Sequence, residues 1–296
     1  MRSTLLICAT ALTCLTIAAQ STKKATRPVP KETQLQVQDA YSNTGFDPTL
    51  ARLPAGFRGH DIQALSSELK SADSAKKKGE FESTEQWAER LRLAEGRPIL
   101  GTLTHNSTYA FLIGQNYSEF SSGIKIDYDA DAARFDISAE AEPPIYFSER
   151  DKPGGVLSLP IWTGRPDSGA YIGSNGFGAV REVTEYSSRE YKLIIVNSAA
   201  FPFIDIPVWK LLGFKQIRGE VSASPAIARD VKSQIHLLAV CKLAPPYVTS
   251  GWSNREATLD NPVSRNITYT YVHVDLEAVW IYNQETGEVY ARIPDR

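Results

Sequence analysis

The sequence predicts a mainly β to α+β fold, in which antiparallel sheets form a meander or a sandwich. Three observations lead to this class. Short β-rich runs separated by Gly, Pro, Asn and Asp begin near Pro98. Apolar residues at helical spacing come before them, and a long alternating segment followed by a turn closes the chain. We expect a pair of N-terminal helices and one later helix near residues 224–234.

Composition divides the chain into five segments. With 296 residues, of which 42% are apolar, the chain has core material for one large domain or two ordinary ones. We expect a signal peptide, a flexible arm, a helical segment packed on the body, a β-rich domain, and a second β-rich or α+β half that ends in a hairpin. Their bounds are residues 1–20, 21–54, 55–97, 98–200 and 201–296.

The first 20 residues have the features of a secretory signal peptide. Arg2 precedes an apolar run from Leu5 to Ala19, which ends in small residues before a polar stretch. This run is shorter than the roughly 20 residues that a membrane-spanning helix needs, although a retained anchor is the alternative. The sequence therefore predicts a periplasmic or secreted protein without an integral membrane span after cleavage.

Cleavage would leave Cys241 as a lone thiol, because Cys8 and Cys14 belong to the first 20 residues. An intramolecular disulfide is then impossible. Cys241 lies in the apolar run 235–243, where a thiol behaves as a small hydrophobic group. We expect it to be buried and inert.

The first predicted helix begins after Asp61, whose carboxylate can cap it. It runs to about Ala75. Apolar residues at helical spacing form one face of this helix, namely Ile62, Leu65 and Leu69. We expect that face to pack on the body.

The second predicted helix begins at Ser83, which stands three residues before Gln86 in the arrangement of a capping box. Gly96 and Pro98 end it. Its predicted buried stripe consists of Trp87, Leu91 and Ala94. Phe81 should fold back onto the same core.

The β-rich domain contains seven predicted strands. We expect turns at residues 148–155 and 164–168, where Gly, Pro and Asp gather. The predicted strands cover residues 99–103, 108–113, 123–128, 132–138, 156–162, 178–186 and 190–197.

The second half mixes strands with helical segments. The apolar but proline-broken stretch 201–212 predicts a buried crossing or a short helix. Ser224-Pro225 starts a helix whose face continues through Ile227, Val231 and Ile235. It lies between strands, in a strand-helix-strand order around residues 217–243.

The last part of the chain carries the clearest β signal. Pro245-Pro246 should end the strand 235–243, and a polar loop should follow from Thr249 to Arg265. Residues 272–282 place Val272, Val274, Leu276, Ala278, Trp280 and Tyr282 on one face. A turn with Gly287 at positive φ should then lead into a final strand with Val289, Ala291 and Ile293.

Three weak candidate sites emerge, each beside a structural explanation. Aspartates at alternate positions resemble the start of a calcium loop, but glycine and glutamate are missing further on, so a hairpin turn is favoured. These are Asp127, Asp129 and Asp131. An acid-base row on the last long strand consists of His273, Asp275 and Glu277, but the solvent-exposed face of an amphipathic strand is the favoured explanation.

The third candidate is a glycine-rich stretch whose flanking side chains can form a shallow ligand-binding surface, although a tight turn feeding the next strand is favoured. Its members are Tyr171, Asn175 and Phe177. The stretch matches neither a phosphate-binding loop nor a nucleophile elbow. No motif calls for a cofactor, and we predict none.

The charge balance argues against a nucleic-acid partner. The chain has 32 basic and 34 acidic residues, a formal net charge of -2. A nucleic-acid binder usually carries a broad positive field.

The segment Glu80-Phe-Glu-Ser-Thr-Glu-Gln-Trp-Ala-Glu-Arg90 also carries a resemblance. Together with Tyr128-Asp-Ala-Asp131 and the stretch 171–178, it resembles uncharacterised bacterial exported proteins with an E-F-E-[ST]-T-x-x-[WY]-x-x-R segment. The resemblance implies an envelope location but no assigned activity.

These observations favour a non-enzymatic binding or structural protein with an unknown partner in the cell envelope. The 11 Phe, 13 Tyr and 5 Trp residues can furnish binding surfaces. The alternative is an envelope hydrolase that uses acid-base residues on β-strands, for which His273, Asp275 and Glu277 are the first candidates.

Overall fold

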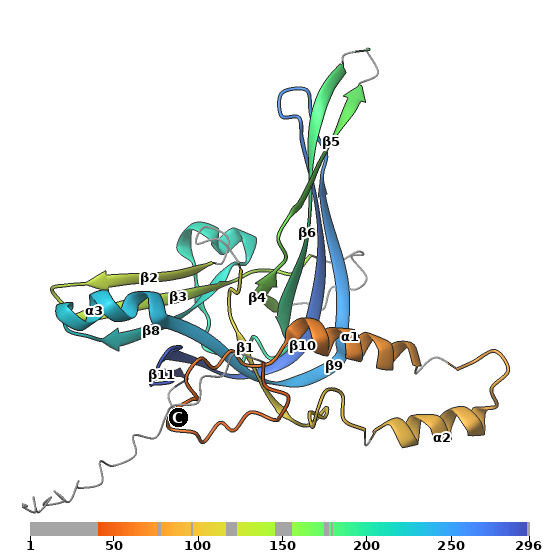
Figure 1. Ribbon diagram of the computed structural model, residues 1–296, viewed down its shortest axis with the longest axis horizontal. Helices are drawn as coiled ribbons and strands as arrows, with labels where there is room; N and C mark the ends of the chain where they lie inside the picture. Colours follow the sequence, from red (N-terminus) through yellow and green to blue (C-terminus); the bar gives the residue numbers. More distant parts are fainter. Residues whose placement is uncertain are drawn as a thin grey trace, which may run out of the picture. The chain divides into compact units, whose positions relative to one another are not determined.

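The computed structural model describes residues 41–75, 78–95, 97–116, 123–145, 156–174, 178 and 180–294. These residues belong to one compact unit, which extends over residues 35–296. The chain is mainly β to α+β, with antiparallel pairing dominant (Figure 1). The predicted signal peptide, with Cys8 and Cys14, lies outside the described residues.

Seven strands form the larger sheet, in the order β1-β9-β10-β6-β4, with β11 also beside β10 and β5 also beside β6. The long strands β9 and β10 run side by side through its centre (Figure 1). The strands are β1 (Thr108–Leu112), β4 (Leu157–Thr163), β5 (Asp167–Ser174), β6 (Val180–Ile195), β9 (Ile235–Arg255), β10 (Val263–Asn283) and β11 (Val289–Ile293).

One pairing in this sheet is parallel. β6 and β10 run in the same direction, whereas every other pair among the described strands is antiparallel. Pattern alone does not reveal such a pairing, because the two strands are far apart in the chain and the connection between them includes β9 and two strands of the second sheet. The expectation of antiparallel sheets holds for the other pairs of described strands but not for this one.

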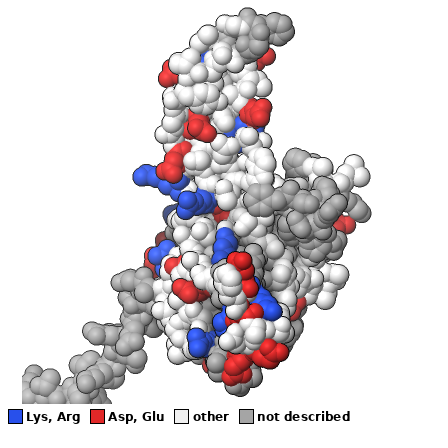
Figure 2. Space-filling model, turned by 90° about the vertical axis from the view of Figure 1, so that its right-hand side faces the viewer, with Lys and Arg blue, Asp and Glu red and all other residues white. Residues whose placement is uncertain are grey.

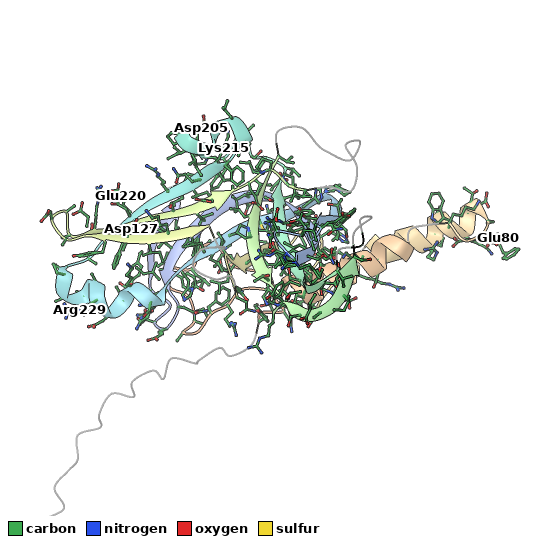
Figure 3. All side chains as sticks on the ribbon, turned by 90° about the horizontal axis from the view of Figure 1, so that it is seen from above. Glu80, Asp127, Asp205, Lys215, Glu220 and Arg229 are labelled. Carbon is green, nitrogen blue, oxygen red and sulfur yellow. The ribbon has the colours of Figure 1, made fainter. Side chains whose placement is uncertain are left out.

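The smaller sheet has the order β2-β3-β8-β7. Its strands are β2 (Ile124–Asp129), β3 (Arg134–Ala141), β7 (Ile204–Asp205) and β8 (Lys215–Ser222). Glu220 and Asp127 lie on its exposed side (Figure 3), and the Lys215 Nζ atom lies 3.9 Å from the Asp205 Oδ1 atom near one end. β3 alternates buried residues with exposed or half-buried ones, and β8 does so less regularly because Gln216 and Ile217 are both buried, so one face of this pair packs and the other is mostly exposed.

The two N-terminal helices are α1 (Ile62–Ala75) and α2 (Thr84–Glu95). The predicted caps of both are confirmed. The Asp61 Oδ1 atom accepts bonds from the backbone N–H groups of residues 63 and 64, at 2.8 and 3.1 Å. At α2, the Ser83 N–H donates to Gln86 Oε1 at 2.9 Å and the Gln86 N–H donates to Ser83 Oγ at 3.2 Å.

The two helices differ in how they pack. The apolar face of α1 is buried, as predicted, in the core shared with the large sheet. Phe81, just before α2, is 94% exposed, and Trp87 is only half-buried. The expectation that Phe81 folds onto the core is therefore wrong, because a cap and an apolar period form a helix without specifying what covers it.

Shorter helical segments occur in the second half. A 3₁₀ helix spans Pro207–Leu212, α3 spans Pro225–Val231, and a 3₁₀ turn spans Lys232–Gln234. These segments confirm the helix near 224–234 and the short-helix alternative for 201–212. Ile227 is 56% exposed, however, so the predicted face of α3 is wrong at that position, where Ala228 is buried instead, while Val231 and Ile235 do pack on the core.

Both faces of the large sheet are buried where residues 235–243 of β9 pair with residues 274–283 of β10. One core contains side chains from α1, the small sheet and alternate residues of β9 and β10. A second core lies on the opposite face under the segment 41–60, which contributes Phe46, Leu53 and Phe57. The Phe46 and Leu53 N–H groups donate to Thr108 and Gly287 carbonyls, both at 2.8 Å. The segment 41–54 is thus fixed to the body at Phe46 and Leu53, although most of its other side chains are exposed, so the predicted flexible arm does not extend through these two residues.

A bulge explains how β10 serves both cores. Its register shifts at Glu277, so Val272, Val274 and Leu276 lie in the first core while Trp280 and Tyr282 lie in the second. The predicted single apolar face is wrong for this reason. The terminal turn is confirmed, with Gly287 at φ 75°. A Cβ atom there would meet the Leu53 carbonyl oxygen, so two constraints require glycine.

Several strand predictions need correction. Residues 99–103 form turns and one isolated bridge instead of a strand. β6 runs unbroken through the two strands predicted at 178–186 and 190–197, and β5 occupies residues predicted as turns. The remaining predicted strands, 108–113, 123–128, 132–138 and 156–162, are confirmed within a few residues. The turn expected at 148–155 lies outside the described residues.

β9 and β10 also continue through the predicted polar loop. Leu243 pairs with Val274 and Val248 pairs with Val272, so residues 244–247 bulge out opposite His273. A proline has no backbone N–H group to donate to the neighbouring strand, and a residue in a bulge does not need to donate one. Pro245-Pro246 therefore interrupts β9 without ending it.

None of the helices within the described part of the chain is long and apolar enough to cross a membrane.

The two halves expected at residues 98–200 and 201–296 are not separate in the structure. β6 pairs with β10, and β3 pairs with β8, so both sheets draw strands from both halves. The first core contains residues of both as well. Both halves belong to one compact unit, which is the first of the two possibilities that composition left open.

Candidate functional site

An open cavity of about 750 Å³ lies against β6 and β10, beside the segment that joins β4 to β5. Apolar surface comes from Tyr186 and Ile267, and charged groups come from Glu190 and two arginines. A volume of this size is ordinary for a small-molecule site. The lining residues are Asn116, Thr163, Gly164, Arg165, Pro166, Tyr186, Ser188, Glu190, Arg265 and Ile267.

The parallel register between β6 and β10 brings these side chains together. Tyr186 pairs with Arg265, and Ser188 pairs with Ile267. Paired residues share a face of the sheet, and alternate residues along one strand share it too. Tyr186, Ser188 and Glu190 therefore form one row, next to a row from β10. Sequence spacing cannot show this arrangement, because the rows are almost 80 residues apart.

A buried lysine lies one step further along the same row. The Lys192 side chain is 8% exposed, and its Nζ atom lies 2.5 Å from Glu142 Oε1 and 3.1 Å from Glu190 Oε2. Nζ is also 4.7 Å from the centre of the Tyr269 ring. Burial by itself would lower the pKa of the Lys192 ammonium, but the two carboxylates together raise it above its ordinary value. Lys192 is thus charged and neutralised by two acids.

Glu190 connects this cluster to the cavity, since it lines the cavity and contacts Lys192. Burial also raises the pKa of Tyr269 to about 12, so its hydroxyl is protonated at neutral pH. The cluster can hold the Glu190 carboxylate in place at the cavity wall. The sequence offered one signal for it, a charged Lys192 directly before an apolar run in a predicted strand.

The three residues of the predicted acid-base row on β10 differ in how far they are buried. His273 is 2% exposed, and its Nε2 atom lies 2.8 Å from Thr249 Oγ1. Burial lowers its pKa to about 4, so the ring is neutral at pH 7. Asp275 is exposed, and the Glu277 carboxylate lies 3.3 Å from Lys242 Nζ. The expectation that all three occupy a wet face is wrong for His273.

His273 is buried because other segments cover its face of the sheet. Ile194, Tyr269 and Tyr271 form a small core there, with Val156 against it. The Ile145 N–H donates to the Tyr271 hydroxyl at 2.9 Å, so the segment after β3 crosses this face. An alternating strand pattern cannot distinguish a covered polar face from a solvated one.

The predicted aspartate run forms the β2–β3 turn. The Asp129 Oδ1 atom accepts bonds from the N–H groups of Asp131 and Ala132, both at 3.0 Å. Asp127 is in an ion pair with Lys125 at 2.9 Å. Within the described residues, no group of three or more metal-binding side chains gathers, and the favoured hairpin interpretation is confirmed.

The glycine-rich candidate lies on and after β5. Tyr171 is 47% exposed in the middle of that strand, so the tight turn predicted here does not include it. Asn175 and Phe177 lie outside the described residues. Pairing of Ser174 with Val180 shows that the chain reverses between these two positions, as the prediction required.

A second open cavity, of about 430 Å³, lies near the start of β9. Arg58, Gln115 and His236 line it. The Tyr41 hydroxyl donates to Gln115 Oε1 at 2.7 Å, and burial lowers the pKa of His236. Gln115 and Gln284, which also lines this cavity, both bond to the segment 41–60, which suits a structural joint.

Other buried polar groups have structural partners. His60 is 1% exposed, its Nδ1 atom accepts the Ala110 N–H at 2.8 Å, and its Nε2 lies 2.9 Å from the Thr44 carbonyl oxygen. Cys241 is a fully buried free thiol whose pKa is raised by burial, as expected for an inert cysteine.

Comparison of the chain with protein families, with curated proteins and with solved structures gives no match.

Proposed function

We propose that this protein is an exported binding protein of the cell envelope that holds its ligand in the cavity between β6, β10 and residues 163–166. The observation that carries the proposal is the lining of that cavity, which combines apolar surface with a few convergent polar groups. This combination is the usual composition of a ligand site, where apolar contacts supply affinity and polar groups supply orientation. The location rests on the apolar N-terminal run.

The charges of the lining indicate the chemistry of the ligand. Arg165 and Arg265 are exposed, and arginine binds carboxylate or phosphate groups through its planar fork. Glu190, held by Lys192, offers a fixed acceptor for hydroxyl or amine groups. A molecule with an anionic group and several hydroxyls or amides fits this set, as fragments of the bacterial cell wall do.

Thermal unfolding in the presence of soluble muropeptides and glycerophosphates tests this proposal. Ligand that binds only the folded state raises the melting temperature. Ser188→Trp should fill the cavity and abolish that shift. Ser187→Trp is the matched control, because the exposed Ser187 is adjacent on β6 and faces the opposite side of the sheet.

The expected result is a shift for the wild type and for Ser187→Trp, and none for Ser188→Trp. Equal shifts in both variants would place the ligand elsewhere. Absence of any shift in the wild type, with these compounds at millimolar concentration, would refute this ligand chemistry.

A further inference from the structure

β5 presents a long free edge. Its neighbour in the described part of the sheet is β6, and all eight of its residues are exposed except the half-buried Gly173. Edge strands usually carry lysine, proline or a bulge that prevents pairing with another chain. β5 reads Asp-Ser-Gly-Ala-Tyr-Ile-Gly-Ser, and its register with β6 is unbroken. It therefore lacks each of these protections.

Apolar side chains are exposed beside this edge on both faces. Ile172 is 70% exposed and Val180 is 62% exposed, and alternation places them on one face of the sheet. Tyr171, 47% exposed, lies on the other face. A further strand along β5 would cover parts of both faces and satisfy the unpaired backbone groups.

We infer that β5 pairs antiparallel with β5 of a second copy of this chain, about a two-fold axis that passes beside Ala170. In such an isologous contact, a residue on the axis faces itself, and residues equally far from it face each other. Tyr171 then lies opposite the partner's Gly169. Asp167 lies opposite the partner's Gly173.

The space around the glycines fits this register. A Cβ atom built on Gly169 meets nothing within 4 Å, so the surface there is open. Gly169 and Tyr171 share a face, because they are two residues apart on one strand. Each Tyr171 ring can therefore cover the partner's Gly169. Gly173, in contrast, already lies against its own Tyr171 ring, at 3.5 Å from the same built position.

Charge complementarity selects the same register. Gly173 pairs with Arg181 on β6, and both are on the face that carries Asp167. The exposed Arg181 of the partner lies two strand spacings, or about 10 Å, from Asp167, and its side chain is long enough to reach that carboxylate above the Val183 and Tyr171 side chains that pack beside Gly173. Within one chain Asp167 pairs with Ser187, which is six residues from Arg181, or about 20 Å along the strand. This ion pair can form only between copies, and the two-fold axis produces it twice.

Sedimentation equilibrium of the full chain with exchanged charges tests the pairing. Asp167→Arg and Arg181→Asp should each raise the dimer dissociation constant about tenfold, since each places like charges together at two positions. The double variant should return to within about twofold of the wild type. Leu259→Arg is the control, because the exposed Leu259 lies outside the strands and should leave dimerisation unchanged.

A wild type that stays monomeric at roughly 100 µM would overturn the inference, since specific dimers with standard interfaces form well below that concentration. A double variant that dimerises no better than the single variants would overturn the proposed register. Circular dichroism confirms that each variant is folded before its dissociation constant is compared.

Cross-linking provides a second measurement that does not depend on charge. A residue that faces itself across antiparallel strands has a Cα separation of about 4.5–5.5 Å, which a disulfide can span. Ala170→Cys, in a chain with Cys8→Ser and Cys14→Ser, should therefore form a covalent dimer on mild oxidation. Leu259→Cys in the same background should not. Equal cross-linking of the two would contradict the two-fold contact.

Discussion

The lower and upper halves of the β9–β10 pair are built from the same two strands but serve different purposes. In the lower half, residues 235–243 of β9 and 274–283 of β10 have cores on both faces. In the upper half, residues 249–255 and 263–268 are largely exposed or half-buried. The difference shows that continuity of a strand does not imply continuity of the core beneath it.

The junction between the two halves contains polar side chains, and another segment of the chain covers them. Lys192, Tyr269 and His273 lie there, beneath the segment that contains Glu142 and Ile145. On the face seen in Figure 2, both basic and acidic side chains are present, and acidic ones gather at the lower end. We expect the lower half to determine stability, and the upper half to determine binding and association.

The largest expected effect contrasts one tryptophan in each half. Trp280 is 2% exposed, with the Arg292 guanidinium 4.1 Å from its ring and Phe46 at its edge. Trp280→Ala should lower the free energy of unfolding by about 3–5 kcal/mol, because it leaves a cavity in a packed core. Trp252 is 51% exposed, so Trp252→Ala should cost less than about 1 kcal/mol. Urea unfolding measures both, and similar losses would erase the distinction between the halves.

A smaller effect is expected from the buried charges of the junction. Lys192→Met removes the cation that pairs with both Glu142 and Glu190, so we expect a loss of about 2–3 kcal/mol. The double variant Lys192→Met/Glu190→Gln should recover part of that loss. Lys242→Met is the control, because its exposed ion pair with Glu277 is worth less than about 1 kcal/mol. Equal losses from both single variants would show that burial at the junction contributes nothing.

The smallest effect concerns pH. His273 has a pKa of about 4 in the folded protein, whereas an unfolded histidine has its ordinary pKa near 6.5. The unfolded state therefore takes up this proton first as pH falls, and stability is lost between pH 6.5 and pH 4. We expect the residue to account for about 2 kcal/mol of the loss between pH 7 and pH 4.5.

His273→Gln keeps a polar group near Thr249 but does not titrate, so it isolates that contribution. Urea unfolding at both pH values should show a shallower pH dependence in the variant than in the wild type. Other carboxylates and histidines titrate equally in the two proteins. An unchanged slope would mean that water reaches His273 and that the junction is open.

Local signals in the sequence predicted the elements whose causes are local. The Asp61 and Ser83 caps, the Asp129 turn and the positive φ of Gly287 depend on a few neighbouring residues, and all were foreseen. The candidate sites fared differently. Among the described residues, none of the predicted site residues lines the large cavity, most of whose lining comes from two strands that pairing brings together and from the segment 163–166.

The sequence by itself determined the mainly β to α+β class, most strand positions, the helix starts and the burial of Cys241, because period, capping and turn chemistry act within one or two turns of chain. Only the tertiary structure decided the parallel β6–β10 pairing, the bulges opposite His273 and at Glu277, and the enclosure of Lys192. These features depend on which distant segments meet, and a residue's polarity does not state what will lie against it.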